Sequence, residues 1–448
     1  MSSSQAAFPE EKALPQASSA SVSVADSDAV YRKVMLHLVP MLVIVYIIAY
    51  IDRSNVGFAK LGFMKDLGFG DTVFGIGAGV FYAGYMIFEI PSNLMLARIG
   101  FRKTLLRIMI LWAVCSGLLA TMTSPNSFYF ARFLLGAAEA GLFPGVLLYL
   151  TYWVPVSRRS RFTAFFMAAI PLSGVISGPL SGAIMHGMGG VLGLKGWQWL
   201  FLIEGAPALV FAIIVYAFMR DKPADAKWLS PAEHDLIERE LAADQTKGTP
   251  NQHHSFVDAL KSPRFYLLVG MGVALLASAS NISFWLPTII QHSGVKSNLT
   301  IGLMSMAPYI VGVIAQQWVA RRSDLHGERR WHAAVCATVS ALGWCSLPLF
   351  SDNSTLSLVA LIATAGGTFA TMGPFWAMPG LYLSRKAAAG GIALISTLAG
   401  VGSLISPVLV GWLNELTKTP AAGQYYLAAL LMVGAVTVVA IGPHDRKR

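Results

Sequence analysis

Apolar residues gather along this chain into long runs that short polar turns separate. A helix needs about 20 mostly apolar residues to cross the hydrocarbon core of a bilayer, and runs of this length recur from one end of the sequence to the other. The pattern predicts an all-α polytopic membrane protein with twelve membrane-spanning helices. Their expected ranges are 34–57, 73–95, 104–122, 128–150, 161–185, 197–219, 265–290, 299–320, 331–350, 356–383, 387–413 and 425–441.

One long polar stretch, 220–262, divides the predicted spans into two sets of six. We therefore expect two six-helix bundles, 31–219 and 263–442. A central loop would join them and carry a short helix at 230–244, with Pro231 in its first turn. Short basic turns that contain glycine follow both the second and the eighth span, which indicates two structural repeats around a central pathway. The remaining ends, 1–30 and 443–448, are expected to be cytoplasmic tails, the first of them disordered.

The charge is sparse and unevenly distributed. Charged residues make up 12% of the chain, about half of what a soluble domain carries, and the formal net charge is +10. If the N-terminus is cytoplasmic, 26 of the 33 lysines and arginines fall on the cytoplasmic side, and Lys60 is among the five outside. This asymmetry predicts a multi-pass protein of the inner membrane with both termini cytoplasmic. It also explains the basic charge without nucleic acid as a partner.

Several function classes find no support in the sequence. Cys115, Cys336 and Cys345 each lie within an apolar run, so they show neither metal-ligand spacing nor a disulfide framework. No nucleophile with a positioned base and no phosphate-binding glycine loop is evident. We therefore expect no enzymatic activity, no bound metal and no cofactor, other than the proton as a coupling ion.

Four ionisable residues lie inside two predicted spans, where such side chains are costly. Asp52 and Arg53 stand near the outer end of the first span, and Arg132 and Glu139 lie in the fourth. Seven residues correspond to two helical turns, so the latter two share a face. The planar guanidinium group of arginine presents paired N–H donors that match the two oxygens of a carboxylate. The buried acids could take up and release protons. These residues predict a proton-coupled anion carrier. Alternatively, Asp52 pairs with Arg132, or Glu139 with Arg53, only to hold the helices in register.

Weaker candidates surround these four charges. Tyr50, Tyr82 and Tyr85 form a stripe that suits a hydroxylated or aromatic carboxylate, although tyrosines also pack or lie at interfaces. The second half offers neutral groups such as Asn281, Trp376 and Ser396. Glu204 and His37 are interpreted as structural. The candidate gate residues at the cytoplasmic side are Glu89, Arg98, Arg102, Asp324 and Arg329.

Five strings of residues carry a resemblance to a known family. They are Tyr50-Ile-Asp-Arg-Ser-Asn55, Glu139-Ala-Gly-Leu-Phe-Pro144, Gly196-Trp-Gln-Trp-Leu-Phe-Leu-Ile-Glu-Gly205, Ala224-Asp-Ala-Lys-Trp-Leu229 and Gly391-Ile-Ala-Leu-Ile-Ser396. Through them the chain resembles the major facilitator superfamily and, within it, the anion:cation symporter family, which includes bacterial tartrate, hydroxyphenylacetate, phthalate and galactonate carriers. The resemblance implies that Arg53 and Arg132 hold the substrate carboxylate, that Asp52 and Glu139 are protonated, and that the bundle alternates its access.

The sequence departs from the pattern of that family at two places. Ala97 and Asn93 replace the usual acidic residue and leading glycine of the turn after span two, so the charge of the inner gate would come from Glu89. Ser396 and Gly400 replace two asparagines of span eleven, which favours a smaller polar substrate or a bulkier, flatter anion.

The expected protein is therefore a monomeric carrier that imports a small organic carboxylate, such as tartrate, an aromatic carboxylate or a sugar acid, together with protons. Two alternatives remain open: a uniporter or anion exchanger for the same substrates, and a membrane receptor that senses a metabolite without transporting it.

Overall fold

A computed structural model describes residues 24–247, 260, 262–382 and 388–442. The expected tail at 443–448 and most of the tail at 1–30 lie outside these residues, as does the end of the central loop. The regular structure of the described residues is helical. Its main elements are α1 (Val24–Leu67), α2 (Asp71–Ile99), α3 (Phe101–Leu119), α4 (Pro125–Glu139), α5 (Leu142–Thr151), α6 (Val156–Met167), α7 (Ala169–Gly187), α8 (Gly196–Phe218), α9 (Pro231–Lys247), α11 (Pro263–His292), α12 (Asn298–His326), α13 (Arg330–Ser346), α14 (Ser354–Ala377), α15 (Pro379–Tyr382), α16 (Ala388–Thr417) and α17 (Ala421–Ala440).

The predicted all-helical membrane fold is confirmed. Eleven helical stretches of the described chain are long and apolar enough to cross a membrane. The remaining expected span, 104–122, corresponds to α3, which packs between α4 and α8 and carries Arg102, Lys103 and Arg107 in its first two turns. Because of these three cations, α3 is less apolar than the eleven other spans. Two spans are interrupted: α4 and α5 together form the fourth, and α6 and α7 the fifth.

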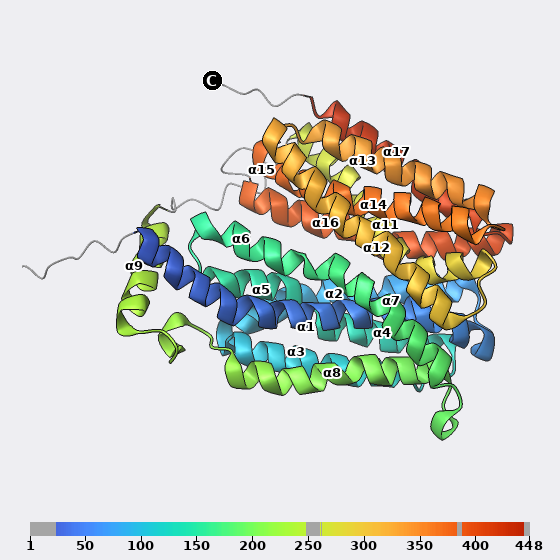
Figure 1. The fold of residues 1–448 in the computed structure, drawn as a ribbon, viewed down its shortest axis with the longest axis horizontal. Helices are drawn as coiled ribbons and strands as arrows, with labels where there is room; N and C mark the ends of the chain where they lie inside the picture. The colour runs from blue at the N-terminus through green and yellow to red at the C-terminus, as the bar shows by residue number, and fades with distance from the viewer. Residues whose placement is uncertain (1–23, 248–259, 261, 383–387, 443–448) are drawn as a thin grey trace, which may run out of the picture.

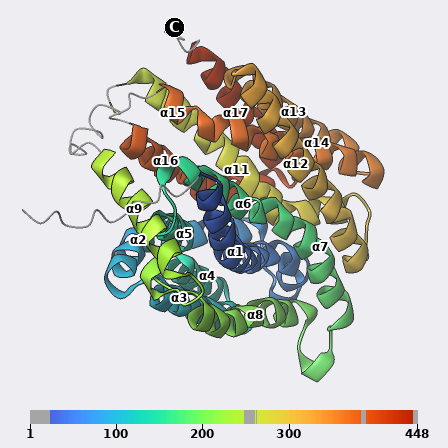
Figure 2. The same ribbon diagram turned by 60° about the vertical axis from the view of Figure 1, so that its left-hand side comes forward.

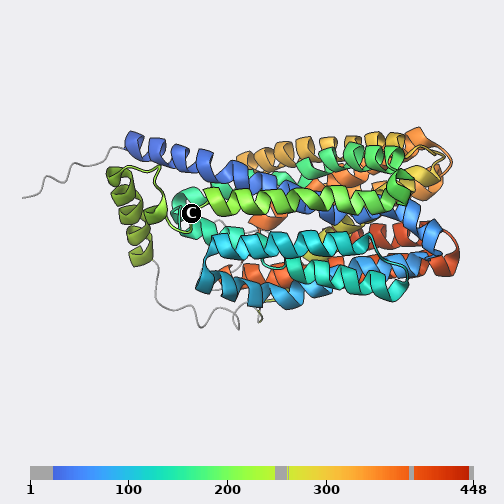
Figure 3. The same ribbon diagram turned by 90° about the horizontal axis from the view of Figure 1, so that it is seen from below.

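The helices are arranged in two groups that lie side by side (Figures 1 and 2). One group contains α1 to α8, and the other contains α11 to α17. Helix α9 lies beyond one end of the first group and runs across the axes of the other helices (Figure 3). We call this end of the molecule the α9 end and the opposite end the far end.

The two halves touch closely toward the far end. A Cβ atom added to Gly75 of α2 would lie 2.4 Å from the carbonyl oxygen of Pro407 in α16. Similarly, a Cβ atom added to Gly178 of α7 would lie 2.5 Å from the carbonyl oxygen of Gly302 in α12. Only glycine allows backbones to approach this closely. Because α2 begins at Asp71 and α7 ends at Gly187, both contacts lie in the far-end half of their helices.

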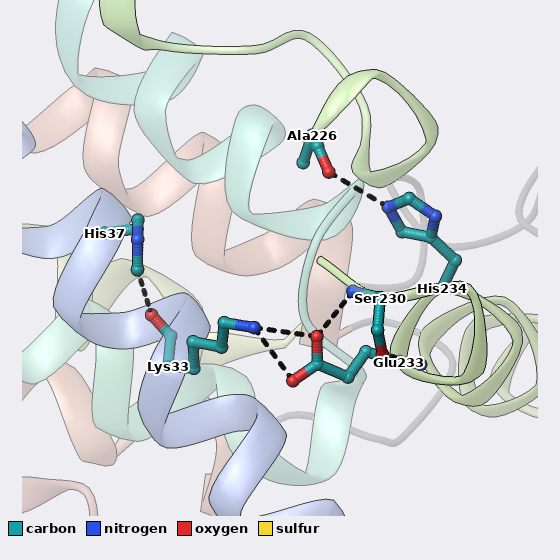
Figure 4. Close-up of polar contacts among 6 residues, drawn as sticks. All are labelled: Lys33, His37, Ala226, Ser230, Glu233 and His234. Carbon is teal, nitrogen blue, oxygen red and sulfur yellow. Dashed lines mark hydrogen bonds and ion pairs between the residues drawn. The ribbon is translucent and has the colours of Figure 1, made fainter. Parts of the chain in front are cut away.

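At the α9 end, hydrogen bonds and an ion pair join α9 to the first turns of α1. Helix α1 begins at Val24, inside the stretch that the sequence analysis assigns to a disordered tail, and its first turns reach α9. Lys33 donates to both carboxylate oxygens of Glu233, at 3.0 and 2.8 Å, and the Ser230 backbone donates to the same carboxylate at 2.7 Å (Figure 4). Burial disfavours the Glu233 anion, but these bonds outweigh it and hold the pKa of Glu233 below its usual value. His37, interpreted as structural, stacks on Trp228 with ring centroids 4.1 Å apart.

Candidate functional site

The fourth span is broken at the charged site. Ser124 caps α4 by accepting from the Ser127 backbone, and Pro125 occupies the first turn. The helix then ends at Glu139, in the middle of the span, because Gly141 adopts the left-handed conformation with φ at +87°. A Cβ atom at Gly141 would also lie 2.5 Å from the Ser92 hydroxyl. The break therefore places a carboxyl group at a helix end within the membrane.

Close packing of α2 against α4 brings the aromatic residues of α2 to the charges of α4. A Cβ atom added to Gly136 would lie 1.9 Å from the carbonyl oxygen of Phe81, and one added to Gly84 would lie 2.3 Å from that of Phe133. The two backbones are therefore in contact along this stretch. This contact sets the position of the Phe81 ring beside Arg132.

Arg53 and Glu139 form the central ion pair. The Arg53 Nη2 and Nε atoms donate to Oε2 of Glu139 at 2.6 and 3.2 Å. The Glu139 side chain is not exposed at all, whereas 12% of the Arg53 side chain is exposed. The second oxygen of Glu139, Oε1, has no hydrogen-bond partner among the described residues. One of the two pairs considered from the sequence is thus present, and it joins α1 to the broken α4.

Arg132 is buried without an ion-pair partner in the described part of the chain. Its Nε atom donates to the backbone carbonyl of Gly77 at 3.2 Å, while Nη1 and Nη2 have no partner. The guanidinium lies 4.6 Å from the Phe81 ring centroid and 5.9 Å from that of Phe284, a residue of α11. Arg132 therefore has two free donors and is sheltered by aromatic rings from both halves of the molecule.

The expected tyrosine stripe lies around Arg53. The Arg53 guanidinium is 4.7 Å from the ring centroid of Tyr50, 5.2 Å from Phe81 and 5.4 Å from Tyr85. Tyr82 lies near Phe284, with centroids 6.3 Å apart. Phe81 thus contacts both guanidinium groups. We call the set Tyr50, Arg53, Phe81, Tyr82, Tyr85, Arg132, Glu139 and Phe284 the central cluster.

Asp52 lies apart from the central cluster. Its carboxylate accepts hydrogen bonds from Trp112 Nε1 at 2.7 Å, Ser116 Oγ at 2.5 Å and Asn55 Nδ2 at 3.1 Å. Consecutive residues of a helix point about 100° apart, so Asp52 enters the interior of the first half while Arg53 faces the cluster. The expected group of four charges is therefore a group of three, with Asp52 held separately between α1 and α3.

The neutral candidates of the second half are spread along its helices. Asn281 is buried, and its amide donates to Ser406 of α16 at 2.9 Å. Trp376 packs against the buried cluster that includes Phe265 and Phe375, and Ser396 is exposed on α16. The contact from this half to Arg132 is instead Phe284, one helical turn after Asn281, which the sequence analysis did not select.

The candidate gate residues make their described contacts within their own halves. Arg102 donates to the carbonyl oxygen of Tyr216 at 3.0 Å through Nε, and its backbone donates to Asp221 at 2.9 Å. Asp324, in the last turn of α12, pairs with Arg329, which directly precedes α13. Arg98 is exposed and Glu89 is half-buried. This conformation therefore gives Arg102, Asp324 and Arg329 anchoring contacts, and the role of all five residues as a gate stays a prediction.

Two charged residues have positions that differ from the sequence interpretation. Lys60, assigned to an outer loop, lies within α1 with 3% of its side chain exposed. It pairs with Asp71 at 3.1 Å, and its ammonium group lies 3.3 Å from the ring centroid of Trp285 in α11. The assignment failed because α1 stays helical ten residues beyond the expected end of the first span. Glu204, interpreted as a structural residue near the end of a span, is fully buried in α8.

The described residues contain no group of three or more histidine, cysteine, aspartate or glutamate side chains that could hold a metal ion. The geometry is that of a membrane bundle with a buried centre of ionisable and aromatic side chains. It defines the class of a helical membrane carrier.

Comparison with known proteins gives the family. The model of the Major Facilitator Superfamily matches residues 42–321 and 292–448, and the chain belongs to this superfamily. The D-xylose-proton symporter of known crystal structure has the same fold, with a TM-score of 0.72 at 13% identity, over 93% of this chain and 99% of that one.

Two relatives match over almost their whole length. A protein of Agrobacterium vitis named "Putative tartrate transporter" is 42% identical over 92% of this chain and 94% of its own length. A protein of Pseudomonas putida named "Putative metabolite transport protein NicT" is 40% identical over the same shares. The chain is therefore a membrane transporter for small molecules and not an enzyme, as the sequence analysis expects.

Proposed function

We propose that this protein is a proton-coupled transporter of the anion:cation symporter type, which imports a small organic carboxylate by alternating access. The observation that carries the proposal is the central cluster, where two arginines share an aromatic surface and Arg132 keeps Nη1 and Nη2 without partners. Two parallel N–H donors match the two oxygens of a carboxylate. The name of the tartrate-transporter relative supports the same substrate class.

The aromatic surroundings of the two arginines favour a substrate that has hydroxyl groups or an aromatic ring in addition to its carboxylate. Tyr50, Tyr82 and Tyr85 add hydroxyl groups beside the rings, and Phe284 brings the second half of the molecule into the site. A hydroxylated carboxylate such as tartrate, an aromatic carboxylate or a sugar acid fits this mixture of donors and rings. The monomer contains the complete set of these side chains.

Coupling to protons follows from competition for Arg53. In this structure Glu139 occupies the donors of Arg53 that a substrate carboxylate would need. Protonation of Glu139 removes its negative charge and frees the guanidinium for the substrate. Substrate binding and protonation of Glu139 then favour each other, which is the linkage that a symporter requires.

The topology gives the direction of access. We place the α9 end and both termini in the cytoplasm of a cell with an inner membrane, because the basic turns gather there. The close contacts at Gly75 and Gly178 lie toward the far end, so the halves are joined on the outer side. We propose that the halves separate on the cytoplasmic side of this joint to give the substrate access to the central cluster.

Binding by the purified protein is the first test. A thermal-shift screen against tartrate, galactonate, phthalate and hydroxyphenylacetate would identify a ligand. Arg132→Lys keeps the positive charge and removes the paired guanidinium donors. We expect it to weaken binding of the carboxylate about 10- to 100-fold, since a charge-assisted hydrogen bond contributes about 1.5–3 kcal/mol. The matched control, Arg239→Lys on the exposed face of α9, should leave binding unchanged. Equal effects of the two substitutions would contradict the assignment of Arg132.

Transport is tested in proteoliposomes with the best ligand of that screen. Wild-type protein should accumulate it when a pH gradient is imposed. Glu139→Gln should retain counterflow exchange and lose accumulation, because glutamine is neutral at every pH. Counterflow without pH-driven accumulation in the wild type would instead identify a uniporter or exchanger. Binding without any flux would identify a receptor.

A further inference from the structure

Helices α2 and α16, one from each half, pack tightly at the far end and more loosely away from it. A Cβ atom added to Gly411 of α16 would lie 2.3 Å from the carbonyl oxygen of Asp71, the first residue of α2. A Cβ atom added to Gly400, about three turns earlier in α16, would have the Met86 sulfur atom as its nearest neighbour, at 3.8 Å. The two backbones therefore touch where α2 begins, so the first turn of α2 is the part that loses its neighbour when the halves separate at the far end.

This first turn of α2 is capped from the opposite half of the molecule. The N-cap residue of α2 is Gly70, which has no side chain to accept from the first N–H groups of the helix. Glu415 of α16 supplies the acceptor instead, because the Thr72 backbone N–H donates to its Oε2 atom at 2.9 Å. Helix α12 also begins at the far end, but its own Ser297 caps it by accepting from the Thr300 backbone. We call the bond from Thr72 to Glu415 the Glu415 cap.

The position of Glu415 is unfavourable for its own helix and favourable for α2. Helix α16 ends at Thr417, so Glu415 lies in its last turn, where the helix dipole disfavours a negative charge. The same dipole favours a carboxylate at the beginning of a helix, where N–H groups lack partners. Glu415 is exposed, so water can take the place of each partner when the bond breaks. The Glu415 cap therefore suits a contact that is made and broken in every transport cycle.

We propose that the Glu415 cap favours the conformation in which the far end is closed, and that it is broken when the halves open there. Substrate from the outer side binds only molecules whose far end is open, so the cap lowers the apparent affinity for substrate on that side. The inference rests on the alternating access of the proposed function. It adds a residue, remote from the central cluster, that sets the balance between the two conformations.

The balance is measured in the purified full-length protein, without substrate, as the distance between spin labels on Lys65→Cys and Lys296→Cys. Cys345→Ser removes an exposed thiol from this background. We expect Glu415→Ala to raise the ratio of open to closed molecules about 3- to 10-fold, the usual contribution of a helix cap. The control is Asp352→Ala, an exposed acid in the turn before α14 at the same end, which should leave the distances unchanged. An equal effect of the two substitutions would overturn the proposal.

Gly70→Ser separates release of the Glu415 cap from a loss of stability. The backbone of Gly70 is extended, with φ at −87° and ψ at 170°, which is usual for a capping serine. A Cβ atom added there would lie 2.8 Å from Oε2 of Glu415, so the new side chain displaces that carboxylate. We expect the far end to open as in Glu415→Ala while the thermal stability is retained or raised. The double variant should open no further, because each change breaks the same bond. Wild-type distances in either single variant, or additive effects in the double variant, refute the role of the cap.

The consequence for transport is measured as uptake, by cells that produce the protein, of the carboxylate chosen by the thermal-shift screen. We expect Glu415→Ala and Gly70→Ser to lower the KM for external substrate by up to the same 3- to 10-fold factor, whereas damage to the fold would lower the uptake rate without lowering KM. An unchanged or higher KM in both variants overturns the role of the cap and leaves the proposed function intact. A wild type that takes up no carboxylate refutes the proposed function instead, while the spin-label distances still decide whether Glu415 holds the far end closed.

Discussion

At the scale of single residues, the first half of the molecule handles its buried charges in two different ways. Arg53 and Arg132 rest on the same Phe81 ring, at 5.2 and 4.6 Å from its centroid. A cation over an aromatic face gains about 0.5–2 kcal/mol, and this gain helps two like charges to share one site. Asp52 is stabilised instead by direct donors, among them the Trp112 indole at 2.7 Å.

The bond from Trp112 to Asp52 can be tested by Trp112→Phe, which keeps an aromatic ring and loses the donor. We expect a loss of about 1.5–3 kcal/mol of unfolding free energy if Asp52 is ionised. Trp344→Phe is the matched control, because the equally buried Trp344 donates to the neutral hydroxyl of Ser278 at 2.9 Å. Its loss should be about 0.5–1.5 kcal/mol.

Thermal unfolding in detergent measures both variants against the wild type. Equal losses would mean that Asp52 is uncharged in the folded protein. It would then carry a proton at rest.

The sequence indicated the charged residues and the tyrosines of the central cluster but not its two phenylalanines. Arg53, Arg132 and Glu139 stand out because ionisable side chains rarely occur within apolar runs. Phe81 and Phe284 are ordinary in such runs, so nothing distinguishes them before the helices are packed. Asp52 was expected beside Arg53, since the two are adjacent in the chain, and the direction of each side chain follows only from the neighbours of α1.

At the scale of helices, the geometry of the site depends on the contact between α2 and α4. Gly136 faces the backbone of Phe81 without room for a side chain. Any added atom must move Phe81, and Phe81 supports both guanidinium groups. Packing at one glycine is therefore coupled to the spacing of the two arginines.

Gly136→Ala is expected to destabilise the protein by about 1–3 kcal/mol, the usual effect of overpacking, and to weaken carboxylate binding. The matched control is Gly117→Ala in α3, where an added Cβ atom would have no neighbour within 4 Å. That change should be neutral or stabilising by up to about 1 kcal/mol, because alanine favours a helix over glycine. Thermal unfolding with and without ligand separates the two effects. Similar behaviour of both variants would contradict the proposed coupling.

Helix existence was predictable and helix ends were less so. The apolar runs located the spans, but α1 is 44 residues long because polar and charged turns continue it at both ends. The break after Glu139 needs Gly141 in a left-handed conformation. Glycine permits that conformation without requiring it, so the sequence alone does not place the break.

At the scale of the whole molecule, Lys60 contributes to the joint between the halves at the far end. It belongs to α1, pairs with Asp71 of α2 and contacts Trp285 of α11. Three helices thus meet at one buried ammonium group. Alternating access requires this joint to separate on the outward side.

Lys60→Met should favour opening of the far end, because methionine fills similar space and forms neither the ion pair nor the cation–π contact. Spin labels on cysteines at the exposed positions Lys65 and Lys296, with Cys345→Ser to remove an exposed thiol, would report the distance between the halves. We expect a larger fraction of long distances. Lys195→Met is the control, since Lys195 is 64% exposed and its partner Asp66 belongs to the same half. An unchanged distance distribution in Lys60→Met would show that the joint does not depend on this ammonium group.

The separation of buried charge between the halves has an evolutionary consequence. The acids and arginines of the membrane interior belong to α1, α4 and α8, whereas α11 reaches Arg132 with the hydrocarbon ring of Phe284. Under the proposed function, mutations in the membrane interior of the second half can therefore change which anion is accepted without altering the coupling to protons. Under the same proposal, related proteins would differ in substrate and share one coupling mechanism.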